Sequence, residues 1–161
     1  MENWGQYNDR QIFYLSTWQT KNWTDQLPSN NWLALTVGHD KDKQLYSELA
    51  DKCIDKNVLY VCSLGHACEL INDIFDEIIV QKKISVGDSV ASPDDIENSP
   101  MTTKHNDFDE GVWFAMNSAY HGTKDIDKIV VIDLTKETEQ QRLTELIEKI
   151  KKGFIPPDND D

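Results

Sequence analysis

The sequence predicts an α/β fold built on a mostly parallel sheet. Short, nearly continuous apolar runs of strand length alternate along the chain with segments in which apolar residues recur every three or four positions. Such continuous runs are typical of parallel strands, because these are covered by helices on both sides. A length of 161 residues with 39% hydrophobic content fits one compact domain with a full core. We therefore expect a single three-layer domain with helices on both faces of the sheet.

The N-terminal part, residues 1–26, is an aromatic-rich arm in this interpretation. It holds three tryptophans and one clear apolar run, residues 12–15, which we expect to be an edge strand or a docked arm. A turn cluster at residues 27–31 separates it from the first buried strand, residues 32–37. We therefore expect the α/β fold to begin after the arm, with the strand at residues 32–37 as its first buried element.

A helix and a second strand follow the first strand within the length of a βαβ unit. Residues 41–56 carry apolar side chains at helical spacing, and either Asp40 or Asp42 can cap this helix. Residues 58–62 make the second buried strand. Because the crossover in such units joins parallel strands, we expect the two strands to lie side by side with their carboxyl ends at one edge of the sheet.

The middle of the chain is less regular. Helical spacing covers residues 66–76, and we expect the apolar triplet at residues 78–80 to be a short strand. A long polar connection over residues 81–100 follows, and connections of this length are often functional. Residues 101–103 then make a short strand.

The C-terminal part predicts two helices and one strand. A helix covers residues 107–120, where Asp107 and Glu110 have the spacing of a capping box. Residues 129–134 make the last strand, and we expect Thr135 to cap the final amphipathic helix. The apolar stripe of that helix consists of Leu143, Leu146, Ile147, Ile150 and Phe154.

These elements define the expected domain organisation. Residues 27–155 form the α/β domain, in a Rossmann/flavodoxin-like arrangement, and residues 156–161 are a solvated acidic tail. We find no internal repeat and no hinge that would indicate a second domain.

The charge of the chain restricts its partners. The net charge is -13 and the isoelectric point is about 4.6, so phosphate backbones and anionic lipid surfaces are repelled. We therefore expect no nucleic acid and no membrane as partner, and favour a basic protein or a small molecule. Three cysteines without a CxxC pair and the absence of a signal-peptide pattern favour a reduced, cytoplasmic protein.

Three expected strands each lead into small or polar residues and then a histidine, namely His39, His66 and His105. In an open α/β sheet, the loops that leave the carboxyl ends of strands line the ligand crevice. The first candidate cluster combines His105 with Thr102 and Thr103, because two hydroxyls and an imidazole before a helix can hold an anionic or amide group. The alternative is that His105 only satisfies amide groups where the helix starts.

The second candidate cluster is formed by Ser63, Gly65 and Glu69, with His66 between them. Gly65 allows the backbone to approach a ligand closely, and Glu69 lies one turn into the following helix. The segment from Gly65 to Leu70 resembles the short motif that carries the catalytic glutamate of nucleoside deoxyribosyltransferase-like proteins, and its last three residues resemble the equivalent region of TIR domains. This resemblance implies that Glu69 acts on a glycosidic bond. Apart from the resemblance, His105 is a second catalytic candidate. The alternative is a glutamate favoured by the helix dipole.

No cofactor or metal follows from the sequence. It contains no GxGxxG, Walker A, GxSxG or papain-like pattern. A set of His39, His66 and His105 is conceivable as a metal site, but no HxH or HxxxH spacing supports it, and we assign no metal ligand.

A longer resemblance covers about half of the chain, from Asp40 to Tyr120. It rests on Leu59-Tyr60-Val61-Cys62 with Gly65, Cys68-Glu69, Asp73-Ile74-Phe75-Asp76-Glu77, Met101-Thr102-Thr103 with His105, and Trp113-Phe114. On these residues the chain is similar to an uncharacterised bacterial family of Rossmann-like α/β domains of unknown function. The chain departs from that family's pattern at Lys104 and at His66-Ala67. The resemblance implies a bacterial cytosolic domain and supplies no activity.

Two functional hypotheses follow. The first is a non-enzymatic module that binds a partner or a small ligand, one version being an immunity or inhibitor protein that covers a basic toxin. The second is a nucleotide or nucleoside-sugar hydrolase or transferase that uses Glu69. The residues alone leave open whether the protein is an enzyme.

Overall fold

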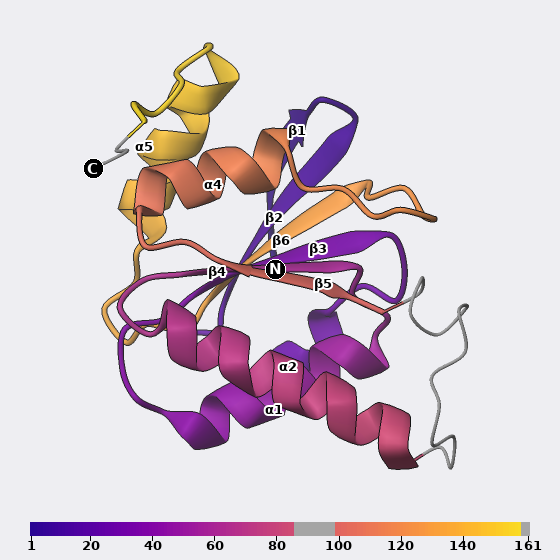
Figure 1. Cartoon of the computed structure of the whole chain (residues 1–161). Helices are drawn as coiled ribbons and strands as arrows, with labels where there is room; N and C mark the ends of the chain where they lie inside the picture. The colour runs from indigo at the N-terminus through magenta and orange to yellow at the C-terminus, as the bar shows by residue number, and fades with distance from the viewer. Residues whose placement is uncertain (86–98, 159–161) are drawn as a thin grey trace.

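The computed structural model describes residues 1–85 and 99–158, which fold around one six-stranded sheet (Figure 1). The strands are β1 (Glu2–Tyr7), β2 (Arg10–Ser16), β3 (Trp32–Val37), β4 (Tyr60–Leu64), β5 (Met101–Lys104) and β6 (Lys128–Asp133). Their order in the sheet is β1-β2-β6-β3-β4-β5. All neighbouring strands run parallel except β1 and β2, so the predicted α/β class with a mostly parallel sheet is confirmed.

The carboxyl ends of four strands meet at one edge of this sheet. Val37 at the end of β3 pairs with Leu64 at the end of β4 on one side and with Asp133 at the end of β6 on the other. On the far side of β4, Ser63 pairs with Lys104 at the end of β5. The parallel pairing of β3 and β4 and the position of β5 beside them are as predicted.

Helices cover both faces of the sheet (Figure 1). The helices α1 (Lys43–Asp55) and α2 (Cys68–Ser85) lie on one face, and α4 (Phe108–Asn117) and α5 (Gln140–Lys151) lie on the other. Side chains alternate between the faces along each strand. Trp32 and Ala34 of β3 pack toward α1 and α2, whereas Leu33 and Leu35 pack toward α4 and α5. The protein thus has two apolar cores, one on each side of the sheet.

Side-chain caps begin two of the helices, as the sequence predicts. Asp42, rather than Asp40, caps α1, since its Oδ1 accepts a hydrogen bond from the Leu45 N–H at 3.1 Å. Asp107 caps α4 and accepts from the Glu110 N–H at 3.1 Å. The expected capping box is only half formed, because the carboxylate of Glu110 binds a histidine instead.

The helix α2 corrects the prediction of a strand at residues 78–80, which lie inside this helix. Periodicity cannot distinguish strand from helix for so short an apolar run. Ile71, Phe75 and Ile78 follow one another at helical spacing and pack into the same core as α1. Lys82 then forms salt bridges with two carboxylates of α1. Helical packing against α1 therefore continues through the triplet.

The start of α5 also differs from the prediction. Thr135 does not cap this helix, since its N–H and hydroxyl donate to Asp133. Glu139 occupies the cap position, and its side chain forms no capping hydrogen bond with the helix. The stripe from Leu143 to Ile150 is buried as predicted, but Phe154 lies beyond the end of the helix and is exposed. The residues between β6 and α5 are therefore held by Asp133, and the buried stripe fixes α5 against the sheet.

The apolar run at residues 12–15 is an interior strand, not an edge strand. It belongs to β2, which lies between β1 and β6. The two-residue turn Asn8-Asp9, with positive φ at both residues, folds β1 back over the outer edge of β2. The outer strand pairs with β2, and Trp4 stacks on Tyr14 with ring centroids 4.5 Å apart. The tight turn thereby adds residues of the predicted arm to the sheet.

Parts of two predicted segments lie outside the described residues, namely residues 86–98 of the long polar connection and residues 159–161 of the acidic tail. The short 3-10 helix η1 (Trp23–Gln26) connects β2 to β3 and buries Trp23. Within residues 1–85 and 99–158, no helix combines the length and the apolar character needed to cross a membrane.

Candidate ligand-binding site

A hollow of about 720 Å³ opens at the edge of the sheet where β3, β4 and β5 end. Its wall consists of residues that follow each of these strands and of one residue from the first turn of α5. The residues that line it are His39, Gly65, His66, Cys68, Glu69, Asn106, Asp107, Phe108 and Arg142. Segments from four parts of the chain therefore converge on one space.

The winding of the sheet reverses beside this hollow. From β3 the chain moves to β4 and β5 on one side, and then returns to β6 on the other side of β3. In open α/β sheets, ligands bind outside the carboxyl ends of the strands at such a reversal. The hollow thus occupies the position at which this class of fold commonly holds a small molecule.

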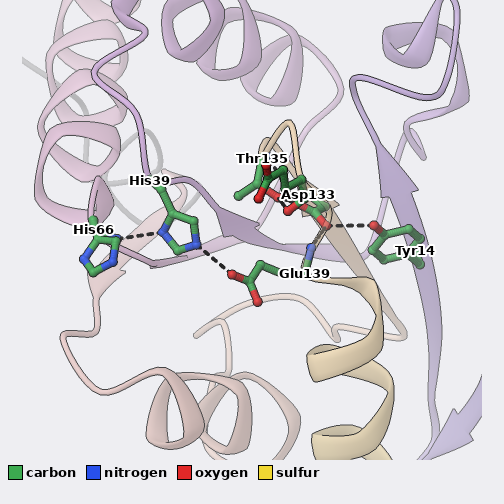
Figure 2. A network of polar contacts seen from close by, with 7 residues as sticks. Tyr14, His39, His66, Asp133, Thr135 and Glu139 are labelled. Atoms are coloured by element: carbon green, nitrogen blue, oxygen red, sulfur yellow. Dashed lines mark hydrogen bonds and ion pairs between the residues drawn. The ribbon is translucent and has the colours of Figure 1, made fainter.

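His39, which follows β3, connects three loops at the hollow (Figure 2). Its Nε2 bonds Glu139 Oε1 at 2.9 Å, and its Nδ1 accepts a hydrogen bond from the His66 backbone N–H at 3.2 Å. Because Nδ1 accepts, the proton of the neutral ring lies on Nε2, which donates to Glu139. Both ring nitrogens are therefore occupied, and His39 serves as a brace between loops rather than as a proton donor or acceptor for a ligand.

Asp133, at the end of β6, holds the loop that carries Glu139 (Figure 2). This carboxylate is fully buried and accepts four hydrogen bonds. Oδ1 accepts from the N–H and the hydroxyl of Thr135, and Oδ2 accepts from the Tyr14 hydroxyl at 2.7 Å and the Glu139 N–H at 2.8 Å. Burial, followed by the bond to Asp133, raises the pKa of Tyr14, which keeps this hydroxyl a donor. Asp133 thereby fixes Glu139 next to His39.

Gly65 permits the close contact between the loops after β3 and β4. Its φ is +90°, and a Cβ there would lie 2.3 Å from the carbonyl oxygen of Gly38 and 2.9 Å from His39 Nδ1. Only glycine combines this backbone conformation with so close an approach. The Ala67 N–H then donates to the same Gly38 carbonyl at 2.9 Å.

Three side chains at the hollow carry a polar group that has no hydrogen-bond partner among the described residues. In residues 1–85 and 99–158, the ring of His66, the amide nitrogen of Asn106 and the guanidinium of Arg142 form no hydrogen bond or ion pair. Arg142 lies over the ring of Phe108, with its Cζ 3.7 Å from the centroid. These groups are available to a ligand, in contrast to the occupied nitrogens of His39.

Glu69 lines the hollow, but its side chain is largely exposed, at 73%. Its carboxylate lies 3.3 Å from Lys104 Nζ. It therefore sits in water-like surroundings, where it can bind hydroxyl or amine groups of a ligand. Its catalytic role stays a prediction.

The first cluster that the sequence favours, around His105, lies behind the wall of the hollow. The ring of His105 is buried and bonds Thr103 Oγ1 at 2.9 Å and Glu110 Oε2 at 2.8 Å, so both nitrogens have partners. Thr102 points to the other face of β5, where its hydroxyl donates to Asp76 at 2.6 Å. Neither threonine lines the hollow.

Ser63 is likewise part of the interior. It is fully buried within β4, and its Oγ accepts a hydrogen bond from the Thr36 hydroxyl at 3.1 Å. Its neighbour Cys62 is buried as well, and this burial raises the pKa of the thiol to about 12. Of the residues favoured from sequence, the structure thus brings Gly65 and Glu69 to the hollow and places Ser63, Thr102, Thr103 and His105 elsewhere.

The structure adds site residues that the sequence did not single out. Asp133 and Glu139 hold the brace, and Asn106 and Arg142 line the hollow. One signal was available, since Asp133 is a carboxylate at the end of an otherwise apolar run. In the described part of the chain, no group of three or more His, Cys, Asp or Glu residues is placed to hold a metal ion.

Comparison with known proteins places the chain in a family without assigning a function. No curated protein matches it. Residues 10–150, which include every strand of the parallel sheet and all residues of the hollow, match the family described as Domain of unknown function (DUF7684). The chain belongs to this family.

Proposed function

We propose that this protein is a non-enzymatic binding module that holds a small polar molecule in the hollow at the carboxyl ends of β3, β4 and β5. The observation that carries this proposal is that some polar groups at the hollow bind protein loops, whereas others have no hydrogen-bond partner in the part of the chain that the structure describes. The side chains of His39, Glu139 and Asp133 use their hydrogen bonds to hold loops. In the described residues, by contrast, the ring of His66, the amide nitrogen of Asn106 and the guanidinium of Arg142 have no hydrogen-bond partner and line the hollow. Such convergence of a few polar groups on one concave space is typical of ligand sites.

The proposal takes the sheet to be wound in the Rossmann-like manner, with the ligand at the reversal beside β3. It favours a small molecule over the basic protein that the net charge suggests. A net charge of -13 attracts any cationic partner and selects none of them. The hollow, by contrast, offers hydrogen-bond donors at fixed positions, which can select one small molecule.

Obstructing the hollow tests the proposal. Desalted protein is incubated with a small-molecule cell extract and examined by native mass spectrometry. Asn106 and Glu69 are exposed positions on different walls, so N106W and E69W should fill the space without disturbing the core. Both variants should lose a bound molecule that the wild type retains.

A matched control comes from a second hollow at the opposite end of the strands, of about 590 Å³, which Lys124 lines. The substitution K124W should leave the bound molecule in place. If the wild type binds no molecule, or if N106W and E69W both retain it, the proposal fails.

A second candidate function, hydrolysis or transfer at a glycosidic bond, is favoured by the position of Glu69 on the wall of the hollow. His105 supports it less, because both of its ring nitrogens bind protein groups. This candidate predicts turnover of a nucleotide or nucleoside by the wild type and none by E69Q. An E69Q protein with wild-type turnover would exclude this role for Glu69.

A further inference from the structure

Arg142 has a chemistry that no other residue of the hollow shares. The chain has two arginines, and the other, Arg10, donates to the backbone carbonyls of Ala115 and Ala119. The guanidinium of Arg142 lies over Phe108, and stacking of this kind leaves the N–H edge of the planar group free to donate. Within residues 1–85 and 99–158 no carboxylate pairs with it, although the whole chain contains 29 Asp and Glu residues.

The carboxylates that line the hollow, and that of Glu139 beside it, each have a protein partner. The carboxylate of Glu139 bonds His39, and that of Glu69 lies against Lys104. Asp107, which also lines the hollow, caps α4 through its Oδ1. In the part of the chain that the structure describes, two other lining groups have no hydrogen-bond partner, namely the amide nitrogen of Asn106, which can only donate, and the ring of His66, which can donate. In the described residues, the lining groups without a hydrogen-bond partner are thus groups that can donate, whereas each lining carboxylate has a protein partner.

We propose that the ligand carries an oxyanion, a carboxylate or a phosphate, which the guanidinium of Arg142 binds through two parallel N–H donors. Arginine matches the geometry of both groups, and charge-assisted bonds of this type are about twice as strong as neutral ones. His66 and Asn106 add donors from the loops after β4 and β5. This inference rests on the proposed function, since it names the chemical class of the molecule in the same hollow.

The test is a titration of ¹⁵N-labelled protein at constant ionic strength, followed by NMR. Inorganic phosphate, succinate and neutral ribose are the three probes, and the readouts are the side-chain amide of Asn106 and the backbone amide of His66. Phosphate or succinate should shift these signals in a saturable manner, and the stronger of the two identifies the class of oxyanion. Ribose should not shift them on its own.

The variant R142Q should weaken binding of that anion by about tenfold or more, as expected when a charge-assisted pair of bonds is lost. R142K, which keeps the charge but not the planar fork, should lie between R142Q and the wild type. K149Q is the matched control, because it removes one positive charge from an exposed position of the same helix, away from the hollow. It should change the affinity less than twofold.

Unchanged affinity in R142Q, equal losses in R142Q and K149Q, or shifts that do not saturate would overturn the inference. These results are distinct from failure of the proposed function. If N106W loses the bound molecule while R142Q retains it with wild-type affinity, the hollow is a binding site and the ligand is not recognised through Arg142. If N106W and E69W both retain it, the hollow itself is not the site.

Discussion

The imidazoles of His39 and His105 are held in closely similar ways but have different surroundings. Each bonds a carboxylate, Glu139 at 2.9 Å or Glu110 at 2.8 Å, and each uses its second nitrogen on another protein group. The partners of His105 lie within five residues of it, whereas Glu139 is 100 residues from His39. His105 therefore stabilises one junction, and His39 joins three loops that shape the hollow.

The comparison shows that hydrogen bonding alone does not identify a functional histidine. The side chain of His39 is 27% exposed at the wall of the hollow, and that of His105 is 8% exposed behind it. Our account predicts that substitutions at His39 or in the loops that it joins lower both stability and ligand binding. Substitution of His105 should lower stability alone. Five substitutions test this difference.

The substitution D133N should have the largest effect on stability. Each oxygen of this buried carboxylate accepts two hydrogen bonds. In D133N the amide nitrogen must replace one of these oxygens, and in either orientation it then faces two N–H or O–H donors. We expect a loss of about 3 kcal/mol in the free energy of unfolding, because buried donors are left unsatisfied. Chemical denaturation measures it. The control D127N, at an exposed position just before the same strand, should change stability by less than about 1 kcal/mol.

The substitution G65A should come next, with a loss of about 2 kcal/mol. The new methyl group has a positive φ and meets the carbonyl of Gly38 at 2.3 Å, so the loops after β3 and β4 must separate. G122A is its control, because a Cβ there meets no atom within 4 Å. Ligand binding should weaken in G65A and persist in G122A. Equal melting temperatures for the two variants would show that the loops do not touch as described.

The pair H39Q and H105Q sharpens the comparison directly. Each substitution removes one imidazole with two partners, and each should lower the free energy of unfolding by about 1 to 2 kcal/mol. Binding in the hollow should fall in H39Q and stay at the wild-type level in H105Q. If H105Q lost the ligand and H39Q retained it, our assignment would be wrong, and His105 rather than His39 would support the binding site.

The substitution Y46F should have the smallest effect at neutral pH, about 1 kcal/mol, through the lost bond to the Asp40 carbonyl beside His39. Burial, together with Asp40 and Asp42, raises the pKa of Tyr46 to about 12 in the folded protein. The stability that this shift contributes is complete below pH 10 and is lost as the pH rises from about 10 to 12. The advantage of the wild type over Y46F should therefore shrink across this range in urea titrations. If the difference in unfolding free energy between the wild type and Y46F stayed constant from pH 10 to 12, the raised pKa of Tyr46 would be contradicted.

Local patterns were sufficient to predict most of the sheet and the starts of α1 and α4. The continuous apolar run of β3, the helical spacing after it and Asp42 each act within a few residues, and the parallel pairing of β3 with β4 follows from them. The triplet at residues 78–80 was misassigned because its partner, α1, lies elsewhere in the sequence. The turn Asn8-Asp9 is itself a local hairpin signal, because both residue types tolerate the positive φ that such a turn requires.

The site could be predicted only in part. Gly65 and Glu69 follow a recognisable strand, so their position at the edge of the sheet could be expected. Two other features depend on how α5 packs against the rest of the protein, and no local sequence pattern predicts this packing. They are the bond between His39 and Glu139 and the position of Arg142 over Phe108. Sequence reasoning therefore favoured the hydroxyls near His105, which are close in the chain but turned away from the hollow.

The most direct test of our account is a crystal structure of the protein with the small molecule that native mass spectrometry detects. Our account predicts electron density for this molecule between His66 and Arg142, with its acidic group against the guanidinium. Density at the opposite end of the strands, between Arg10 and Lys124, would contradict it.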